Sequence, residues 1–175
     1  MAQLYEHLCA SSAFDTIDAA EYLADIVQEI AIGLEFSRID IYEGATIPLS
    51  LDQAVPFGLI AHELVANAAT HAYRPDELGR VSVSFSRKDT RVVLSVEDQG
   101  TGLPLELAPD KVSTMGFSLI TALSRQLHGS IRFERRNGLF VELSFPVSAD
   151  EEDFALANPE QQRQAPAKKV HTQTC

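Results

Sequence analysis

The sequence lacks the features of secreted, membrane-spanning and disulfide-stabilised proteins. Its 175 residues include no tryptophan and only two cysteines, Cys9 and Cys175, which lie near opposite ends of the chain without metal-ligand spacing. We interpret both as unpaired thiols in a reducing compartment, and we therefore expect a cytoplasmic protein. No apolar run is long enough to span a bilayer, and the N-terminus has no basic stretch followed by an apolar one.

Positive charge is also scarce. The chain has 14 Lys and Arg residues against 25 Asp and Glu residues, which gives a net charge of −11. Because nucleic acids are held by clustered Lys and Arg side chains, this balance argues against a nucleic-acid partner. Apolar residues make up 45% of the chain, so one globular core is expected, and the length suits one domain with attachments.

Two long segments have apolar residues at helical spacing. The first predicted helix covers residues 18–32, with Thr16 or Asp18 as its N-terminal cap. The second covers about Val55 to Tyr73, with Pro56 in the first turn, where proline is tolerated because its missing N–H has no helical partner there. The apolar stripe of this second helix is Ala61, Leu64, Val65, Ala68 and Ala72.

Alternating apolar residues predict five strands, over residues 36–42, 81–85, 92–96, 131–133 and 139–141. A short polar turn and the Asn137-Gly138 dipeptide indicate that the last four strands form two antiparallel hairpins. A third helix, opened by Ser113 or Thr114, lies between the hairpins. This order predicts an α+β fold, a two-layer α/β sandwich with helices on one face of a mixed, mostly antiparallel sheet.

The second predicted helix carries a polar stripe. Glu63, Asn67, Thr70 and His71 lie at positions i, i+4, i+7 and i+8, so they share one helix face. Such a stripe could simply face solvent, but it contains no Lys or Arg, the usual occupants of a solvated face. Its carboxylate, amide, hydroxyl and imidazole groups are suited to ligating Mg²⁺, accepting a proton or bonding phosphate.

A glycine-containing turn follows the strand that ends at Asp98. Gly100 and Gly102 suit a turn whose backbone approaches a ligand closely, although such a pair is usually only a turn. No Gly-Lys-Ser/Thr follows, which excludes a Walker-type loop, and no helix follows immediately, which excludes a dinucleotide fingerprint. Gly116 opens the third helix, where backbone N–H groups can point at an anion.

The three motifs in this order resemble the ATPase domain of sensor histidine kinases, a fold shared with DNA gyrase, a class of heat-shock chaperones and the MutL repair proteins. Glu63–Ala72 resembles the N box of this family, Asp98–Gly102 its first glycine box, and Gly116–Gly129 its second glycine box with the segment after it. The resemblance covers about Thr46 to Pro146 and implies a Bergerat-type ATPase fold. The short segment between the glycine boxes resembles a subgroup often fused to PAS or light-sensing modules.

The resemblance implies a role for each matching residue, with ATP and Mg²⁺ as the cofactors. Asn67 would ligate Mg²⁺, Glu63 would be the catalytic carboxylate that orients or deprotonates the nucleophile, and Asp98 would accept a hydrogen bond from the adenine amino group. The other implied nucleotide-binding residues are His71, Gly100, Gly102, Gly116 and Phe117.

Two positions depart from the family pattern. Thr70 stands where the N box usually has a phosphate-contacting Lys, and Gln99 replaces the commoner Asn of the first glycine box. Lys111 or Arg74 could supply the missing charge, although each is more often an ordinary surface residue.

The implied organisation is the end of a dimerisation region and a linker helix over residues 1–33, an ATP-binding catalytic domain over residues 34–148, and a disordered tail over residues 149–175. None of the five histidines stands in a phosphoacceptor context, so we expect a piece of a longer kinase. The expected activity is transfer of the ATP γ-phosphoryl group to a histidine on a separate dimerisation domain, for relay to a response regulator. A homodimer through the N-terminal helix is a further implied contact.

Two alternatives stay open. One is a degenerate ATPase-like domain that serves as an adaptor or phosphotransfer scaffold, which the threonine at position 70 and the missing acceptor histidine favour. The other is a serine kinase that inhibits a sigma factor and shares the fold.

Overall fold

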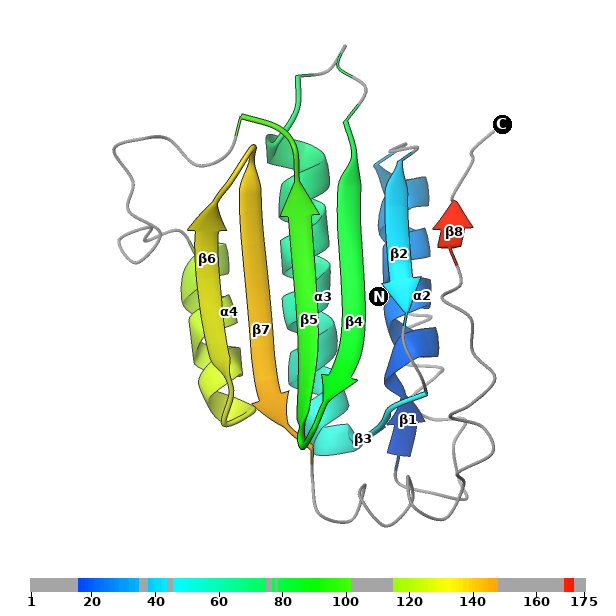
Figure 1. Ribbon diagram of the computed structural model, residues 1–175, viewed down its shortest axis with the longest axis vertical. Coiled ribbons are helices and arrows are strands. Elements are labelled where there is room, and N and C mark those ends of the chain that lie inside the picture. Colours follow the sequence, from blue (N-terminus) through cyan, green and yellow to red (C-terminus); the bar gives the residue numbers. More distant parts are fainter. Residues whose placement is uncertain are drawn as a thin grey trace.

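The computed structural model describes residues 16–34, 38–43, 46–74, 77, 79–101, 115–147 and 169–171. Within these ranges three helices cover one face of a sheet, as Figure 1 shows. The helices are α2 (Ala19–Gly33), α3 (Leu51–His71) and α4 (Met115–Gln126). This arrangement confirms the predicted two-layer α+β fold.

The sheet is mixed and mostly antiparallel, as predicted. Its strand order, within the described residues, is β6 (Ser130–Arg135), β7 (Leu139–Pro146), β5 (Arg91–Asp98), β4 (Val81–Lys88), β2 (Ile39–Glu43) and β8 (Lys169–His171). All neighbouring strands run antiparallel except β2 and β4, which are parallel. Both predicted hairpins are present, with Asp89 at a positive φ of 54° in the first turn.

The core lies between the helices and the sheet. Alternate residues of β4 and β5 are buried, as their sequence pattern predicts, and the whole predicted apolar stripe of α3 is buried with them. Asp18 caps α2 by accepting a hydrogen bond from the Ala20 N–H at 3.0 Å, which confirms one of the two predicted caps. The apolar residues of α2 join the same core, so they pack within this chain.

The structure differs from the sequence predictions at the two ends of α3 and in two strand pairings. Helix α3 begins at Leu51 rather than Val55, because the extended Ser50 and the acidic Asp52 already form its start. Pro56 therefore lies inside the helix, where it cannot donate a hydrogen bond to the Asp52 carbonyl one turn earlier. The helix also ends at His71, two residues before the predicted end.

The other two differences are unpredicted strand pairings. Strands β1 (Thr16–Asp18) and β3 (Pro48–Ser50) form a small antiparallel sheet, and both are too short to show an alternating pattern. Lys169–His171, within the segment expected to be disordered, is strand β8 and pairs with the outer edge of β2. The predicted caps Ser113 and Thr114 lie outside the described residues, as does the start of the strand predicted from residue 36.

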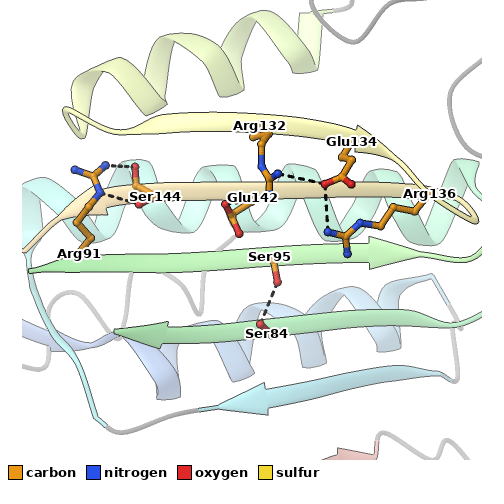
Figure 2. Close-up of polar contacts among 8 residues, drawn as sticks. All are labelled: Ser84, Arg91, Ser95, Arg132, Glu134, Arg136, Glu142 and Ser144. Carbon is orange, nitrogen blue, oxygen red and sulfur yellow. Dashed lines mark hydrogen bonds and ion pairs between the residues drawn. The ribbon is translucent and has the colours of Figure 1, made fainter. Parts of the chain in front are cut away.

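The face of the sheet opposite the helices carries polar side chains that pair across strands (Figure 2). Arg136 lies 3.2 Å from Glu134 and 3.6 Å from Glu97, and its guanidinium carbon is 3.6 Å from the centre of the Phe140 ring. Ser84 and Ser95 are hydrogen-bonded at 3.0 Å. The contacts of Arg136 with Glu97 and Phe140, and that of Ser84 with Ser95, join different parts of the sheet and stabilise it. The candidate functional residues lie on the helix-covered side.

No helix of the described residues is long and apolar enough to cross a membrane.

Candidate functional site

Helices α3 and α4 bring Glu63, Asn67 and Gly116 together. A Cβ atom added at Gly116 would lie 3.1 Å from the Glu63 Oε2 atom and 3.8 Å from the Asn67 Nδ2 atom. Glu63 and Asn67 are partly buried, whereas Thr70 and His71 are exposed. The first half of the polar stripe therefore faces the start of α4 and only its second half faces solvent. The absence of a side chain at Gly116 allows this close approach of α4 to the carboxylate and the amide.

The second part of the site is the carboxylate of Asp98, at the end of β5. Asp98 is 5% exposed. Its Oδ1 atom accepts hydrogen bonds from the Gly100 N–H at 3.0 Å and from the Leu139 N–H at 3.2 Å. The β6–β7 turn comes this close because Gly138 has no side chain, since a Cβ there would lie 2.2 Å from the Asp98 carbonyl oxygen. Two backbone donors from different elements thus hold one carboxylate oxygen and orient the group.

The environment of Asp98 also changes its proton affinity. Burial has the largest influence and raises the pKa of the Asp98 carboxyl above its ordinary value. The hydrogen bonds from Gly100 and Leu139 act in the opposite direction, and the neighbouring charge of Glu97 adds to the rise. A buried carboxylate with a raised pKa and a fixed orientation is typical of a functional site.

The turn after Asp98 packs directly on the C-terminal end of α3. A Cβ added at Gly100 would lie 1.9 Å from the Ala72 carbonyl oxygen, so a side chain there would collide with the helix end. The Thr101 N–H donates to the same carbonyl at 2.9 Å, and the Gln99 N–H donates to the Tyr73 hydroxyl at 2.8 Å. The contact brings the first glycine box to the end of the N box, as the resemblance implies for a single site.

The remaining predicted site residues are placed as follows. His71 lies exposed in the last turn of α3, one residue before the Ala72 contact. Phe117 lies on α4 with its ring packed against Phe133 of β6, at a centroid distance of 5.1 Å. Gly102 and Lys111 lie outside the described residues. The predicted nucleotide contacts of these residues stay predictions.

Three residues around Asp98 were not predicted from the sequence: Tyr73, Gly138 and Leu139. The Asn137-Gly138 dipeptide predicted a hairpin, but no local pattern shows that the hairpin tip reaches a carboxylate 41 residues earlier. The hydroxyl of Tyr73 likewise meets its partner 26 residues later.

The side chains beside Gly116 suit a magnesium ion that is shared with a nucleotide. An amide oxygen such as that of Asn67 is a hard ligand of the kind that Mg²⁺ prefers, and the ion usually takes its other ligands from substrate phosphates and water. Among the described residues there is no group of three or more His, Cys, Asp or Glu side chains that could hold a metal ion by itself. The donor set therefore fits Mg²⁺ bound together with phosphates.

Comparison with known proteins identifies the family. Residues 52–149 match the family model for histidine kinase-, DNA gyrase B- and HSP90-like ATPases, and this match covers more than half of the chain. The chain belongs to this ATPase family. Both halves of the site, the Glu63–Asn67 stripe and the Asp98 turn, lie inside the matched residues.

Individual relatives of this ATPase domain include sensor kinases. The chain is 33% identical over 103 residues to the sensor histidine kinase PdtaS of Mycobacterium tuberculosis, which covers 57% of this chain and 21% of PdtaS. It is 31% identical over 109 residues to the blue-light-activated histidine kinase 1 of Erythrobacter litoralis, which covers 62% of this chain and 30% of that kinase. The chain thus spans less than a third of the length of these curated relatives.

A relative of another kind is the anti-sigma F factor of Lysinibacillus sphaericus, which is 31% identical over 93 residues and is matched over 47% of this chain and 64% of its own length. Among solved structures, the histidine kinase domain of the Erythrobacter litoralis EL346 blue-light-activated kinase superposes with a TM-score of 0.73 and 25% identity, and 85% of this chain and 72% of that chain are covered. The mycobacterial sensor histidine kinase MprB shares the fold, with a TM-score of 0.63 and 16% identity over 75% of this chain and 96% of that chain.

Proposed function

We propose that this chain is the ATP-binding catalytic domain of a two-component sensor histidine kinase. It would transfer the γ-phosphoryl group of ATP to a histidine on the kinase's dimerisation domain, from which a response regulator receives it. The observation that carries the proposal is the oriented, buried carboxylate of Asp98 next to the end of the helix that carries Glu63 and Asn67. A cytoplasmic location, where ATP and response regulators are found, accompanies this function.

Asp98 would select adenine. An ionised carboxylate only accepts hydrogen bonds, so it matches the amino group of adenine and repels the carbonyl oxygen that guanine has at the equivalent position. Its Oδ1 atom is already held by two N–H groups. The remaining acceptor capacity of the carboxylate then points in a fixed direction, and the low exposure of Asp98 strengthens a hydrogen bond made there.

The phosphates would lie toward the start of α4. The N-terminal backbone N–H groups of α4 favour an anion, and the absence of a side chain at Gly116 lets α4 begin close to the polar stripe. Bound Mg²⁺ would neutralise phosphate charge, with Asn67 as its protein ligand. The carboxylate of Glu63 would orient the attacking imidazole or accept its proton. Catalysis of phosphoryl transfer requires mainly this kind of positioning and charge stabilisation.

Calorimetric titration with ATP in the presence and absence of Mg²⁺ tests the nucleotide site. We expect saturable binding that weakens without Mg²⁺ and weakens strongly in the Asp98→Asn variant, whose amide presents an N–H donor as well as an oxygen. If the wild-type protein binds no nucleotide and Asp98→Asn changes nothing, the catalytic proposal fails and the adaptor alternative stands.

A second experiment tests the acceptor. Incubation with labelled ATP and the kinase's own dimerisation domain should give acid-labile phosphate on a histidine. The similarity to the anti-sigma F factor favours serine phosphorylation of a protein partner as the second candidate function. Acid-stable phosphoserine on a partner protein, without acid-labile phosphate, would decide for that candidate.

A further inference from the structure

Tyr73 joins three segments around the Asp98 turn. Its hydroxyl accepts the Gln99 N–H at 2.8 Å and donates to the carbonyl oxygen of Arg80. The ring occupies the space where Gly79 lacks a side chain, since a Cβ at Gly79 would lie 2.2 Å from a ring carbon of Tyr73. One side chain thus links the end of α3, the entry to β4 and the exit from β5.

The Tyr73 hydroxyl is one of three acceptors for consecutive backbone N–H groups in the turn after Asp98. The N–H groups of Gln99, Gly100 and Thr101 donate, in order, to the Tyr73 hydroxyl, the Asp98 carboxylate and the Ala72 carbonyl. Of the two partners outside the turn, the Ala72 carbonyl belongs to the helix backbone, whereas the Tyr73 hydroxyl belongs to a side chain. A single substitution can therefore remove the hydroxyl and leave the backbone intact.

The other side of the Tyr73 hydroxyl is anchored in the sheet. The backbone carbonyl of Arg80 accepts the hydrogen bond from the Tyr73 hydroxyl. The Arg80 side chain donates a hydrogen bond from its Nε atom to the Asp40 carboxylate at 2.6 Å. Asp40 belongs to β2 and is almost fully buried, at 3% exposure. The position of the Tyr73 oxygen is thus fixed by the β2–β4 side of the sheet and not only by the helix end.

We propose that Tyr73 is a positioning residue that sets the direction of the Asp98 carboxylate by holding the backbone of the next residue. The inference rests on the proposed function, in which Asp98 binds adenine. In this role Tyr73 acts through the backbone of Gln99 and not through a contact of its own with the nucleotide. Loss of its hydroxyl leaves the Gln99 N–H to water, the Asp98 turn becomes less restricted, and the nucleotide must order the turn when it binds.

The test uses Tyr73→Phe, which keeps the ring over Gly79 and removes only the hydroxyl. We expect the Kd for ATP to rise about three- to tenfold, the effect of losing one ordinary hydrogen bond, and the Kd for GTP to stay unchanged. The preference for ATP over GTP, measured by displacement of a fluorescent nucleotide, falls by the same factor. Ser95→Ala is the matched control, because it removes a hydrogen bond of 3.0 Å to Ser84 on the open face of β5, and it should leave this preference unchanged.

A double-mutant cycle separates positioning from general stability. If Tyr73 acts through Asp98, Tyr73→Phe causes no further loss of ATP preference in an Asp98→Asn background. A wild-type protein that prefers ATP, with the same preference in Tyr73→Phe, overturns the inference and leaves the proposed function intact. Additive losses in the two variants also overturn it. A wild-type protein that binds neither nucleotide overturns both.

Discussion

The proposed function requires Asp98 to be ionised, whereas its burial favours the neutral carboxyl. Burial raises the pKa of Asp98 in the folded protein, so folding disfavours the ionised form, which is the form that the proposed hydrogen bond from adenine requires. A group whose pKa is raised on folding contributes stability when it is protonated, below its ordinary pKa, and that contribution disappears as the pH rises through the raised value. At neutral pH the ionised Asp98 therefore lowers the stability of the nucleotide-free domain.

Asp98→Asn should consequently raise the melting temperature of the nucleotide-free protein at pH 7 while it strongly weakens ATP binding. The amide keeps an oxygen that accepts the Gly100 and Leu139 N–H groups and carries no charge to be desolvated. Differential scanning fluorimetry over a pH series provides the measurement. The advantage of the variant should shrink as the pH falls through the raised pKa, because wild-type Asp98 then becomes neutral too. A variant that is less stable than the wild type at pH 7 would contradict this account.

Thr70 provides a second prediction at this scale. It is exposed on the polar stripe, one turn beyond Asn67, and it stands at the position where the resemblance implies a lysine. Thr70→Lys should lower the Kd for ATP by about two- to tenfold at low ionic strength, because a cation near the phosphates adds a charge-assisted contact. Added salt should reduce the gain, since an exposed charge is screened. Thr70→Gln, similar in length but uncharged, is the control and should leave the affinity unchanged in calorimetric titration.

The candidate site residues that could be proposed from the sequence are those whose pattern is local. Glu63 and Asn67 share a helix face through their spacing, and Asp98 and Gly100 lie within one turn, so contiguous residues contain the signal. Tyr73 and Gly138 could not be found in this way, because their roles arise from contacts with residues far away in the chain. A tyrosine after a helix and a glycine in a hairpin are common in many proteins. Only the folded structure shows that these two residues lie beside Asp98.

At the scale of elements, the contact between α2 and α3 depends on a glycine. Tyr22 of α2 is 2% exposed, and burial raises the pKa of its hydroxyl. A Cβ added at Gly58 of α3 would lie 2.3 Å from that hydroxyl oxygen. Because the surrounding core is closed, neither Tyr22 nor the helix can move away without disturbing other contacts.

Gly58→Ala should therefore destabilise the protein by about 1–3 kcal/mol, as overpacking of a core usually does, although alanine is the better helix former by about 1 kcal/mol. Gly33→Ala at the end of α2 is the matched control, because a Cβ there meets nothing within 4 Å. Urea denaturation of both variants gives the free energies of unfolding. Equal stability of the two variants would mean that the close approach of the helices is absent in solution.

Element predictions succeeded where the period of apolar residues runs over many residues, as in α2 and in the β4–β5 hairpin. They missed β1 and β3, because three residues contain no measurable alternation. They also placed the start of α3 too late, since proline was assigned to the first turn, where it is most common, and not to the interior position that it has here. Packing of the helix on the core outweighs the missing hydrogen bond at Pro56, which is itself buried.

At the scale of the whole molecule, the sheet order leaves β2 with one side that only β8 covers. An unpaired edge strand presents N–H and C=O groups to any other extended segment, so the pairing with β8 prevents this edge of β2 from pairing with another molecule. Val170 of β8 is the register partner of Ile41. In the sheet, β7 and β8 are separated by four strand spacings, about 19 Å. Residues 148–168 could extend to about 70 Å, so the same molecule can supply the strand.

Val170→Pro should remove this cover, because proline cannot donate to a strand ladder and fixes its own φ. Hydrogen–deuterium exchange should then become faster at Ile39–Glu43 and stay unchanged in the β4–β5 hairpin, which has its own partners. Val170→Thr keeps a β-branched side chain and should exchange like the wild type. Unchanged exchange in the proline variant would mean that β8 is not paired with β2 in solution. Protection that grows with protein concentration would instead show that a neighbouring molecule supplies the strand, and the edge of β2 would then be a contact between copies.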